Sequence, residues 1–118
     1  MRLRAGQRLK RSIDFRAARE QGRRMDCGVF QLIWRRHPAS AEPGSARVGV
    51  VASRAAVGNA VQRNRAKRRL RELYRRNQHL VPAGCDLVLT ARAALLRVEF
   101  AEATARFVHA CEKIKAHA

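Results

Sequence analysis

The segment Gly58–Arg76, GNAVQRNRAKRRLRELYRR, has the pattern of a helix that is apolar on one side and strongly cationic on the rest. At about 100° per residue its apolar side chains fall on one arc, formed by Ala66, Leu70, Leu73 and Tyr74. The opposite row is polar and consists of Asn64, Arg68, Arg71 and Arg75, with Arg65, Glu72 and Arg76 beside it. Burying the arc on a β-sheet would hold the polar row rigidly outward, and we expect that packing.

The charge of this segment predicts a polyanionic partner. Between Arg63 and Arg76 eight basic residues stand against a single acid, and like charges four residues apart destabilise a helix. The whole chain of 118 residues has 26 Lys and Arg against 9 Asp and Glu, a net charge of +17 and a pI near 11.8. A nucleic acid relieves such repulsion. The excess of arginine suits phosphate binding, although a G+C-rich genome also enriches arginine.

Three segments have the pattern of β-strands. Cys27–Arg36 alternates, with one apolar face and one mixed face. The apolar face has Phe30, Leu32 and Trp34, and the mixed face has Val29, Gln31 and Ile33. Arg47–Ser53 and Cys85–Arg92 are mostly apolar and are predicted as buried strands, and the segment His37–Ala46, with two prolines and a glycine, is predicted as a loop.

Two further helices are predicted at the ends of a single domain that covers residues 1–118. The first covers residues 13–21, after a candidate N-cap at Ser12 and before a candidate C′ glycine at Gly22. Residues 1–8 are a candidate disordered basic arm. The last helix covers Glu99–Lys115 and packs on the core through Phe100, Ala103, Phe107, Cys111 and Ile114.

The polar residues outside the basic segment indicate no catalytic or metal site. The acids and histidines form no two-metal motif or acid–base pair, although distant residues can still converge in the fold. Cys27, Cys85 and Cys111 lack metal-binding spacing and are predicted as free buried thiols of a cytoplasmic protein. No segment has the length of a membrane span. Phe30 and Trp34 allow base stacking, but core packing is favoured for each by roughly two to one. A helix-turn-helix is disfavoured, and the residues alone leave RNA and DNA both open.

Residues 47–72, RVGVVASRAAVGNAVQRNRAKRRLRE, closely resemble the signature of the bacterial ribonuclease P protein component, including its Arg-Asn-Arg element at residues 63–65. LKRSIDFRAAREQG at residues 9–22 is similar to the family's first helix, and CDLVLTAR at residues 85–92 to its last strand. The resemblance implies an α+β fold, an αβββαβα two-layer sandwich with a mixed four-stranded sheet. It also implies a short strand near Arg23–Asp26 and a left-handed βαβ crossover, against the general right-handed rule.

The resemblance implies the protein subunit of a ribonucleoprotein whose RNA subunit, with Mg²⁺, removes the 5′ leader of precursor tRNA. No catalytic residue or metal ligand is assigned to the protein, which is expected to be a monomer when alone and to bind the catalytic RNA and precursor tRNA but no membrane. The implied RNA-binding residues are Arg63, Asn64, Arg65, Lys67, Arg68, Arg71 and Arg75. The implied leader-binding cleft consists of Phe15, Arg19, Phe30, Arg54 and Asn59.

Three positions depart from the family pattern. Arg19 stands where a second aromatic residue is frequent, Ile33 where a Tyr or Phe is frequent, and Val98 where a Ser or Thr helix cap is expected. Leader stacking is therefore expected to be weaker than in the family or to be replaced by arginine stacking. The rival hypotheses are a small basic RNA-binding protein of the ribosomal kind and a nuclease that cleaves without an RNA subunit.

Overall fold

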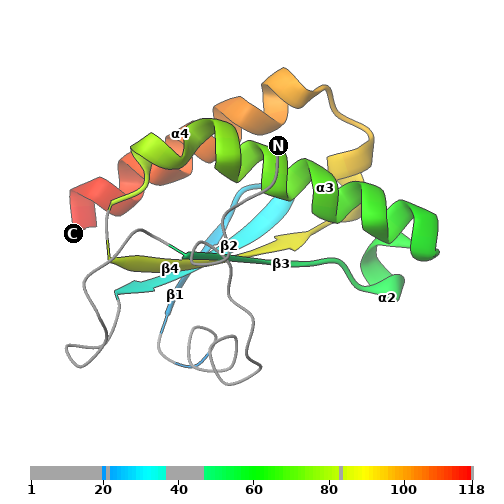
Figure 1. The fold of residues 1–118 in the computed structure, drawn as a ribbon, viewed down its shortest axis with the longest axis horizontal. Helices are drawn as coiled ribbons and strands as arrows, with labels where there is room; N and C mark the ends of the chain where they lie inside the picture. The colour runs from blue at the N-terminus through cyan, green and yellow to red at the C-terminus, as the bar shows by residue number, and fades with distance from the viewer. Residues whose placement is uncertain (1–19, 21, 37–46, 83, 118) are drawn as a thin grey trace.

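A computed structural model of the chain describes residue 20 and residues 22–36, 47–82 and 84–117 (Figure 1). Residues 13–19 of the predicted first helix, the predicted arm over residues 1–8 and the predicted loop His37–Ala46 lie outside the described residues.

A mixed four-stranded sheet forms one layer of the fold, as predicted. Its strands are β1 (Arg23–Asp26), β2 (Phe30–Arg36), β3 (Arg47–Val51) and β4 (Cys85–Ala91), in the order β1-β2-β4-β3. β2 pairs antiparallel with both β1 and β4, whereas β3 pairs parallel with β4. β2 begins three residues later than expected because a turn precedes it, in which the Cys27 N–H donates to the Phe30 carbonyl oxygen at 2.9 Å.

The second layer consists of two long helices that lie together on one face of the sheet (Figure 1). The helices are α2 (Arg54–Val57), α3 (Ala60–Asn77) and α4 (Phe100–His117), and the 3₁₀ turns are η2 (Gln78–Leu80) and η3 (Ala93–Leu96). α3 joins the parallel strands β3 and β4, so it forms the predicted crossover, whose hand stays a prediction. α4 begins at Phe100, so the residue before it is Glu99 and not Val98 as expected. The Glu99 carbonyl oxygen accepts hydrogen bonds from the Glu102 and Ala103 amides.

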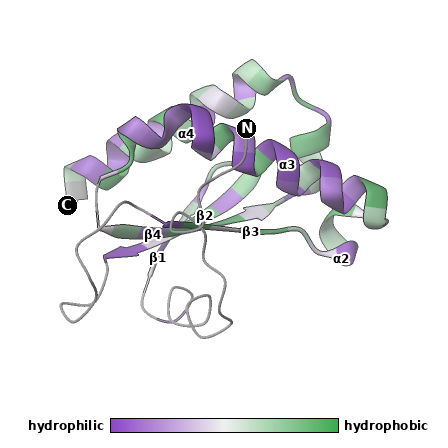
Figure 2. Cartoon of the chain, in the orientation of Figure 1, coloured by the Kyte–Doolittle hydropathy of each residue, from purple (hydrophilic) through white to green (hydrophobic). Residues whose placement is uncertain are grey.

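The main core lies between the sheet and the two long helices, and the predicted alternation of β2 is confirmed. Phe30, Leu32 and Trp34 are buried in the same cluster as the apolar residues of α3 and α4. Ile33 points to the opposite face of the sheet, where it forms a small cluster with Val88. Figure 2 shows mostly hydrophilic residues along α3 and mostly hydrophobic residues along β3. Burial of one face of the sheet therefore positions α3 with its charged side outward.

A capping box sets the start of α3. The Asn59 side chain accepts a hydrogen bond from the Gln62 amide at 2.9 Å, and the Gln62 side chain accepts one from the Asn59 amide at 3.0 Å. Gly58 precedes this box with φ of 123°, and a Cβ built there would lie 2.0 Å from Gln62 Oε1. Glycine is thus required for both the backbone conformation and the close approach of Gln62.

Replacing Gly58 by alanine is expected to lower the free energy of unfolding by about 2 kcal/mol, because it adds backbone strain and displaces the capping glutamine. Urea denaturation followed by circular dichroism measures this loss. Gly84→Ala is the matched control: φ is also positive there, at 78°, but no atom of the other described residues lies within 4 Å of an added Cβ, and the expected loss is about 1 kcal/mol. Equal losses in the two variants would show that the Gln62 contact contributes nothing.

Candidate nucleic-acid interface

The predicted division of α3 into an apolar and a cationic side is confirmed. Leu70, Leu73 and Ala66 are fully buried and Tyr74 is 1% exposed. On the other side the side chains of Asn64, Arg65, Arg68 and Arg71 are exposed, and those of Lys67 and Arg75 are half-buried. The packed arc holds the backbone of α3 against the sheet, so the cations project from a rigid support. Such an arrangement can neutralise phosphates without first ordering a flexible segment.

Two arginines of α3 do not belong to this exposed side. Arg63 lies two residues before Arg65, about 200° away around the helix, and it is half-buried. Its Nε is buried without a hydrogen-bond partner among the described residues. Arg69 donates from its guanidinium to the Leu95 carbonyl oxygen and so joins α3 to η3. Of the predicted RNA-binding residues, Arg63 is therefore the one that the helix directs away from the exposed row.

Glu72 partly neutralises the C-terminal end of α3. Arg75 donates from Nε to Glu72 Oε2 at 3.1 Å and from a second guanidinium nitrogen to Oε1, and Arg76 Nε donates to Oε1 at 2.8 Å. These hydrogen bonds lower the pKa of Glu72 to about 2, so the carboxylate is charged at neutral pH. The Arg76 guanidinium also lies 5.0 Å from the centroid of the Phe100 ring, which joins α3 to the start of α4.

A buried ionic cluster stands on the sheet face that α3 and α4 do not cover. Asp86 of β4 is fully buried, and it lies opposite Arg35 of β2 and Arg47 of β3 in the strand register. Both nitrogens of the Arg47 fork donate to its carboxylate at 2.9 Å, and an Arg35 nitrogen lies 3.2 Å from Oδ2. No functional role was assigned to Asp86 from the sequence. An acid within an otherwise apolar strand was the sequence signal for a buried charge. The partners of Asp86 could not be predicted, because they depend on the register between strands.

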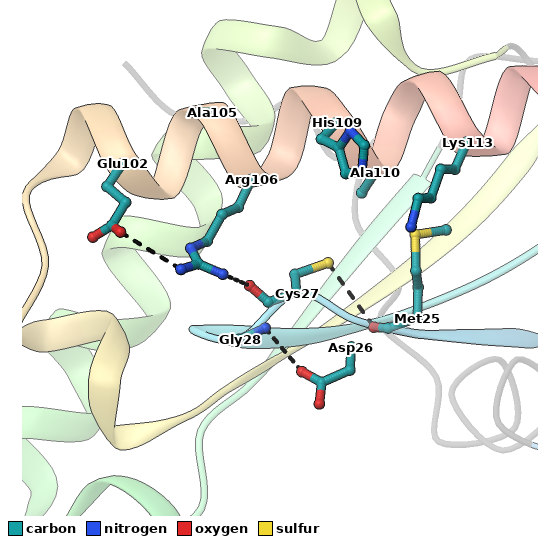
Figure 3. Close-up of a pocket in the computed structure, with 10 residues that line it drawn as sticks. All are labelled: Met25, Asp26, Cys27, Gly28, Glu102, Ala105, Arg106, His109, Ala110 and Lys113. Atoms are coloured by element: carbon teal, nitrogen blue, oxygen red, sulfur yellow. Dashed lines mark hydrogen bonds and ion pairs between the residues drawn. The ribbon is translucent and has the colours of Figure 1, made fainter.

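A pocket of about 660 Å³ lies between the β1–β2 turn and α4 (Figure 3). Its charged groups largely pair with one another. Arg106 donates to the Cys27 carbonyl oxygen at 3.0 Å and lies 3.5 Å from Glu102. Asp26 accepts a hydrogen bond from the Gly28 amide at 2.8 Å and lies 3.4 Å from Arg92. Because these opposite charges offset one another, the pocket attracts a polyanion less strongly than the exposed side of α3 does.

The cysteines and the titratable groups offer no further reactive site in the described ranges. All three thiols are free and buried, as predicted, and burial raises the pKa of Cys27 to about 11 and that of Cys111 to about 12. No group of three metal-binding side chains occurs among the residues that the structure describes. In the same part of the chain, no helix is long and apolar enough to span a membrane.

The model of the family described as ribonuclease P matches residues 3–115. The chain belongs to the bacterial ribonuclease P protein family. Among its curated relatives, the ribonuclease P protein component of Salinispora tropica is 44% identical over an alignment that covers 75% of this chain and 76% of that protein. That of Desulfovibrio desulfuricans is 33% identical and covers 93% of this chain and 84% of that protein. Membership makes this chain the accessory protein subunit of an endoribonuclease that acts in tRNA processing.

Solved structures of the family share this fold. The ribonuclease P protein of Thermotoga maritima superimposes with a TM-score of 0.72 and 26% identity, covering 96% of each chain. The Staphylococcus aureus protein, at 23% identity and a TM-score of 0.74, covers 92% of this chain and 94% of that one and supports the fold alone. The mixed sheet with its covering helices is thus the ribonuclease P protein fold, as the sequence resemblance implied.

The structure separates the residues assigned to a leader-binding cleft. Phe30 is fully buried and its ring centroid lies 6.3 Å from that of Phe107, so its ring is core and is not open to a nucleotide. The assignment of Phe30 to the cleft, which came from the family resemblance, was therefore wrong, and the core packing favoured for this ring is confirmed. Arg54 and Asn59 are exposed, and Asn59 is also the α3 N-cap. Phe15 and Arg19 lie outside the described residues.

Proposed function

We propose that this chain binds the catalytic RNA of ribonuclease P through the exposed side of α3 and promotes removal of the 5′ leader of precursor tRNA. The observation that carries the proposal is the exposed set of cations on a helix whose opposite arc is buried in the core. Arg65, Lys67, Arg68 and Arg71 neutralise phosphates in this proposal, and Asn64 adds a hydrogen-bonding group. Family membership supports RNA over DNA as the partner.

The 5′ leader is proposed to contact the protein near the N-terminal end of α3. Arg54 offers an exposed guanidinium there, and Asn59 keeps its amide N–H groups as donors because its oxygen already accepts from Gln62. Phe15 and Arg19 stay candidates on the sequence resemblance alone. Leader recognition is thus proposed to rely on arginine and amide contacts, with Phe30 excluded.

Mg²⁺ is assigned to the RNA subunit in this proposal. A divalent ion held by the protein would need several oxygen ligands together, and the described residues offer no group of three acids, histidines or cysteines that could supply them. The protein's own contribution is then binding and orientation: its cations lower the repulsion between the catalytic RNA and its anionic substrate.

A cleavage assay at low salt with Mg²⁺ tests the function. Precursor tRNA is incubated with the protein, with the cognate catalytic RNA, and with both. Cleavage is expected only in the combined mixture, and the assembled particle should bind precursor tRNA more tightly than mature tRNA. Cleavage by the protein alone would favour an independent nuclease. Binding to the RNA without any gain in cleavage would favour a structural RNA-binding protein.

A further inference from the structure

The cations of α3 are unevenly opposed by acids along the helix. The first part, residues 63–69, contains five basic residues and no acid, whereas residues 71–76 contain three basic residues and Glu72. Glu72 contacts both Arg75 and Arg76. The helix therefore presents an unopposed cationic end, followed by an end whose charge is partly cancelled from within.

The geometry of the Glu72 contacts bears on what Arg75 can still bind. A guanidinium binds a phosphate most strongly through two parallel N–H groups on one edge. Arg75 already uses its Nε and a terminal nitrogen in this way, one on each oxygen of the Glu72 carboxylate. Arg76 uses its Nε on the same carboxylate and lies over the Phe100 ring. Glu72 does not use the Nη1 group of Arg75, but a phosphate that binds there lies close to the Glu72 carboxylate, whose negative charge offsets that of the guanidinium and weakens the contact.

Arg65 and Arg68 lack such a competitor. Both side chains are exposed, and neither forms an ion pair with any acid of the described ranges. They lie three residues apart and so on neighbouring parts of the same helix surface. Their guanidinium edges are open to phosphate oxygens without the cost of breaking an existing pair.

We propose that Glu72 ends the RNA-binding surface of α3 at Arg71 by neutralising Arg75 and competing with phosphate for Arg76. This inference rests on the proposed function, because it takes RNA as the ligand of α3. Glu72 is then a specificity-determining residue that sets the length of backbone that α3 contacts. The alternative is that Glu72 only stabilises the helix, since an ion pair at this spacing contributes about 0.2–0.5 kcal/mol, and Glu72 would then have no effect on the RNA contact.

The test compares Glu72→Gln with Glu112→Gln in binding to the cognate catalytic RNA across a salt series. Both changes raise the net charge by one, but Glu112 lies on α4, is 71% exposed and, among the described residues, pairs with His109 alone, at 4.0 Å. One recovered phosphate contact is worth about 5-fold in affinity near 0.1 M salt and adds about 0.7–0.9 to the slope of log K against log salt. We expect E72Q to gain about 5-fold or more with a steeper slope, and E112Q to gain less than 2-fold. Equal gains, or a loss in E72Q, would overturn the inference.

A second comparison keeps the inference testable if E72Q loses structure. With Glu72 present, Arg75→Gln is expected to weaken RNA binding less than 2-fold, whereas Arg68→Gln weakens it about 5-fold. In the E72Q background, Arg75→Gln should remove most of the gain. Equal effects of R75Q and R68Q with Glu72 present would contradict a role for Glu72. Failure of the wild-type protein to stimulate cleavage would instead contradict the proposed function, so the two failures are distinguishable.

Discussion

Replacing Asp86 by alanine is expected to lower the free energy of unfolding by about 3–5 kcal/mol, the cost of removing one partner of a buried ion pair. Asp86 is fully buried between Arg35, which is 8% exposed, and Arg47, which is 28% exposed. The substitution removes the acceptor of two Arg47 hydrogen bonds and the carboxylate that Arg35 approaches at 3.2 Å. Because native domains are stable by only about 5–15 kcal/mol, the variant should melt at a much lower temperature.

Asp26→Ala is the matched control for this change. Asp26 is 63% exposed and pairs with Arg92 at 3.4 Å, so removing it also deletes an acid opposite an arginine, but in solvent. The expected loss is below about 1 kcal/mol. Urea denaturation of the two variants followed by tryptophan fluorescence measures the difference, because Trp34 is nearly buried. A loss for Asp86→Ala as small as that for Asp26→Ala would mean that water already solvates the cluster.

The double replacement Arg65→Ala and Arg68→Ala is expected to weaken binding to the catalytic RNA by about 25–60-fold near 0.1 M salt. Two phosphate contacts are lost, and counterion release makes each worth about 5–8-fold there. The slope of log K against log salt should become shallower by about 1.4–1.8. Both side chains lie outside the buried arc, so the melting temperature should stay near that of the wild type.

Lys113→Ala with Lys115→Ala removes the same two charges from exposed positions on α4. If the exposed side of α3 is the RNA contact, this control should lose less than about 5-fold in affinity, through the lower net charge alone. An equal loss in the two double variants would show that general charge, and not the arrangement on α3, drives binding. A large drop in the melting temperature of the α3 variant would show that Arg65 or Arg68 supports the fold.

Local periodicity was enough to predict the long helices α3 and α4 and the strands β2, β3 and β4. The 3.6-residue repeat of α3 and α4 and the two-residue repeat of β2 depend on neighbours a few positions away, and all three appear as expected. β1 was predicted only from the family resemblance, because Arg23–Asp26 is too short and polar to show a strand pattern. The short helix α2 was not expected, although Ser53 provides its N-cap.

For the candidate site, too, some features followed from local sequence and others depended on tertiary contacts. The residue order along α3 was sufficient to predict its apolar and cationic sides, because both sides lie on one helix. Tertiary packing was needed to establish that the helices cover the Phe30 side of β2, since the residue types alone favoured core packing of that ring only by about two to one. It also decided the partners of Asp86, because Arg47 is 39 residues away and meets it only through the register of β3 on β4.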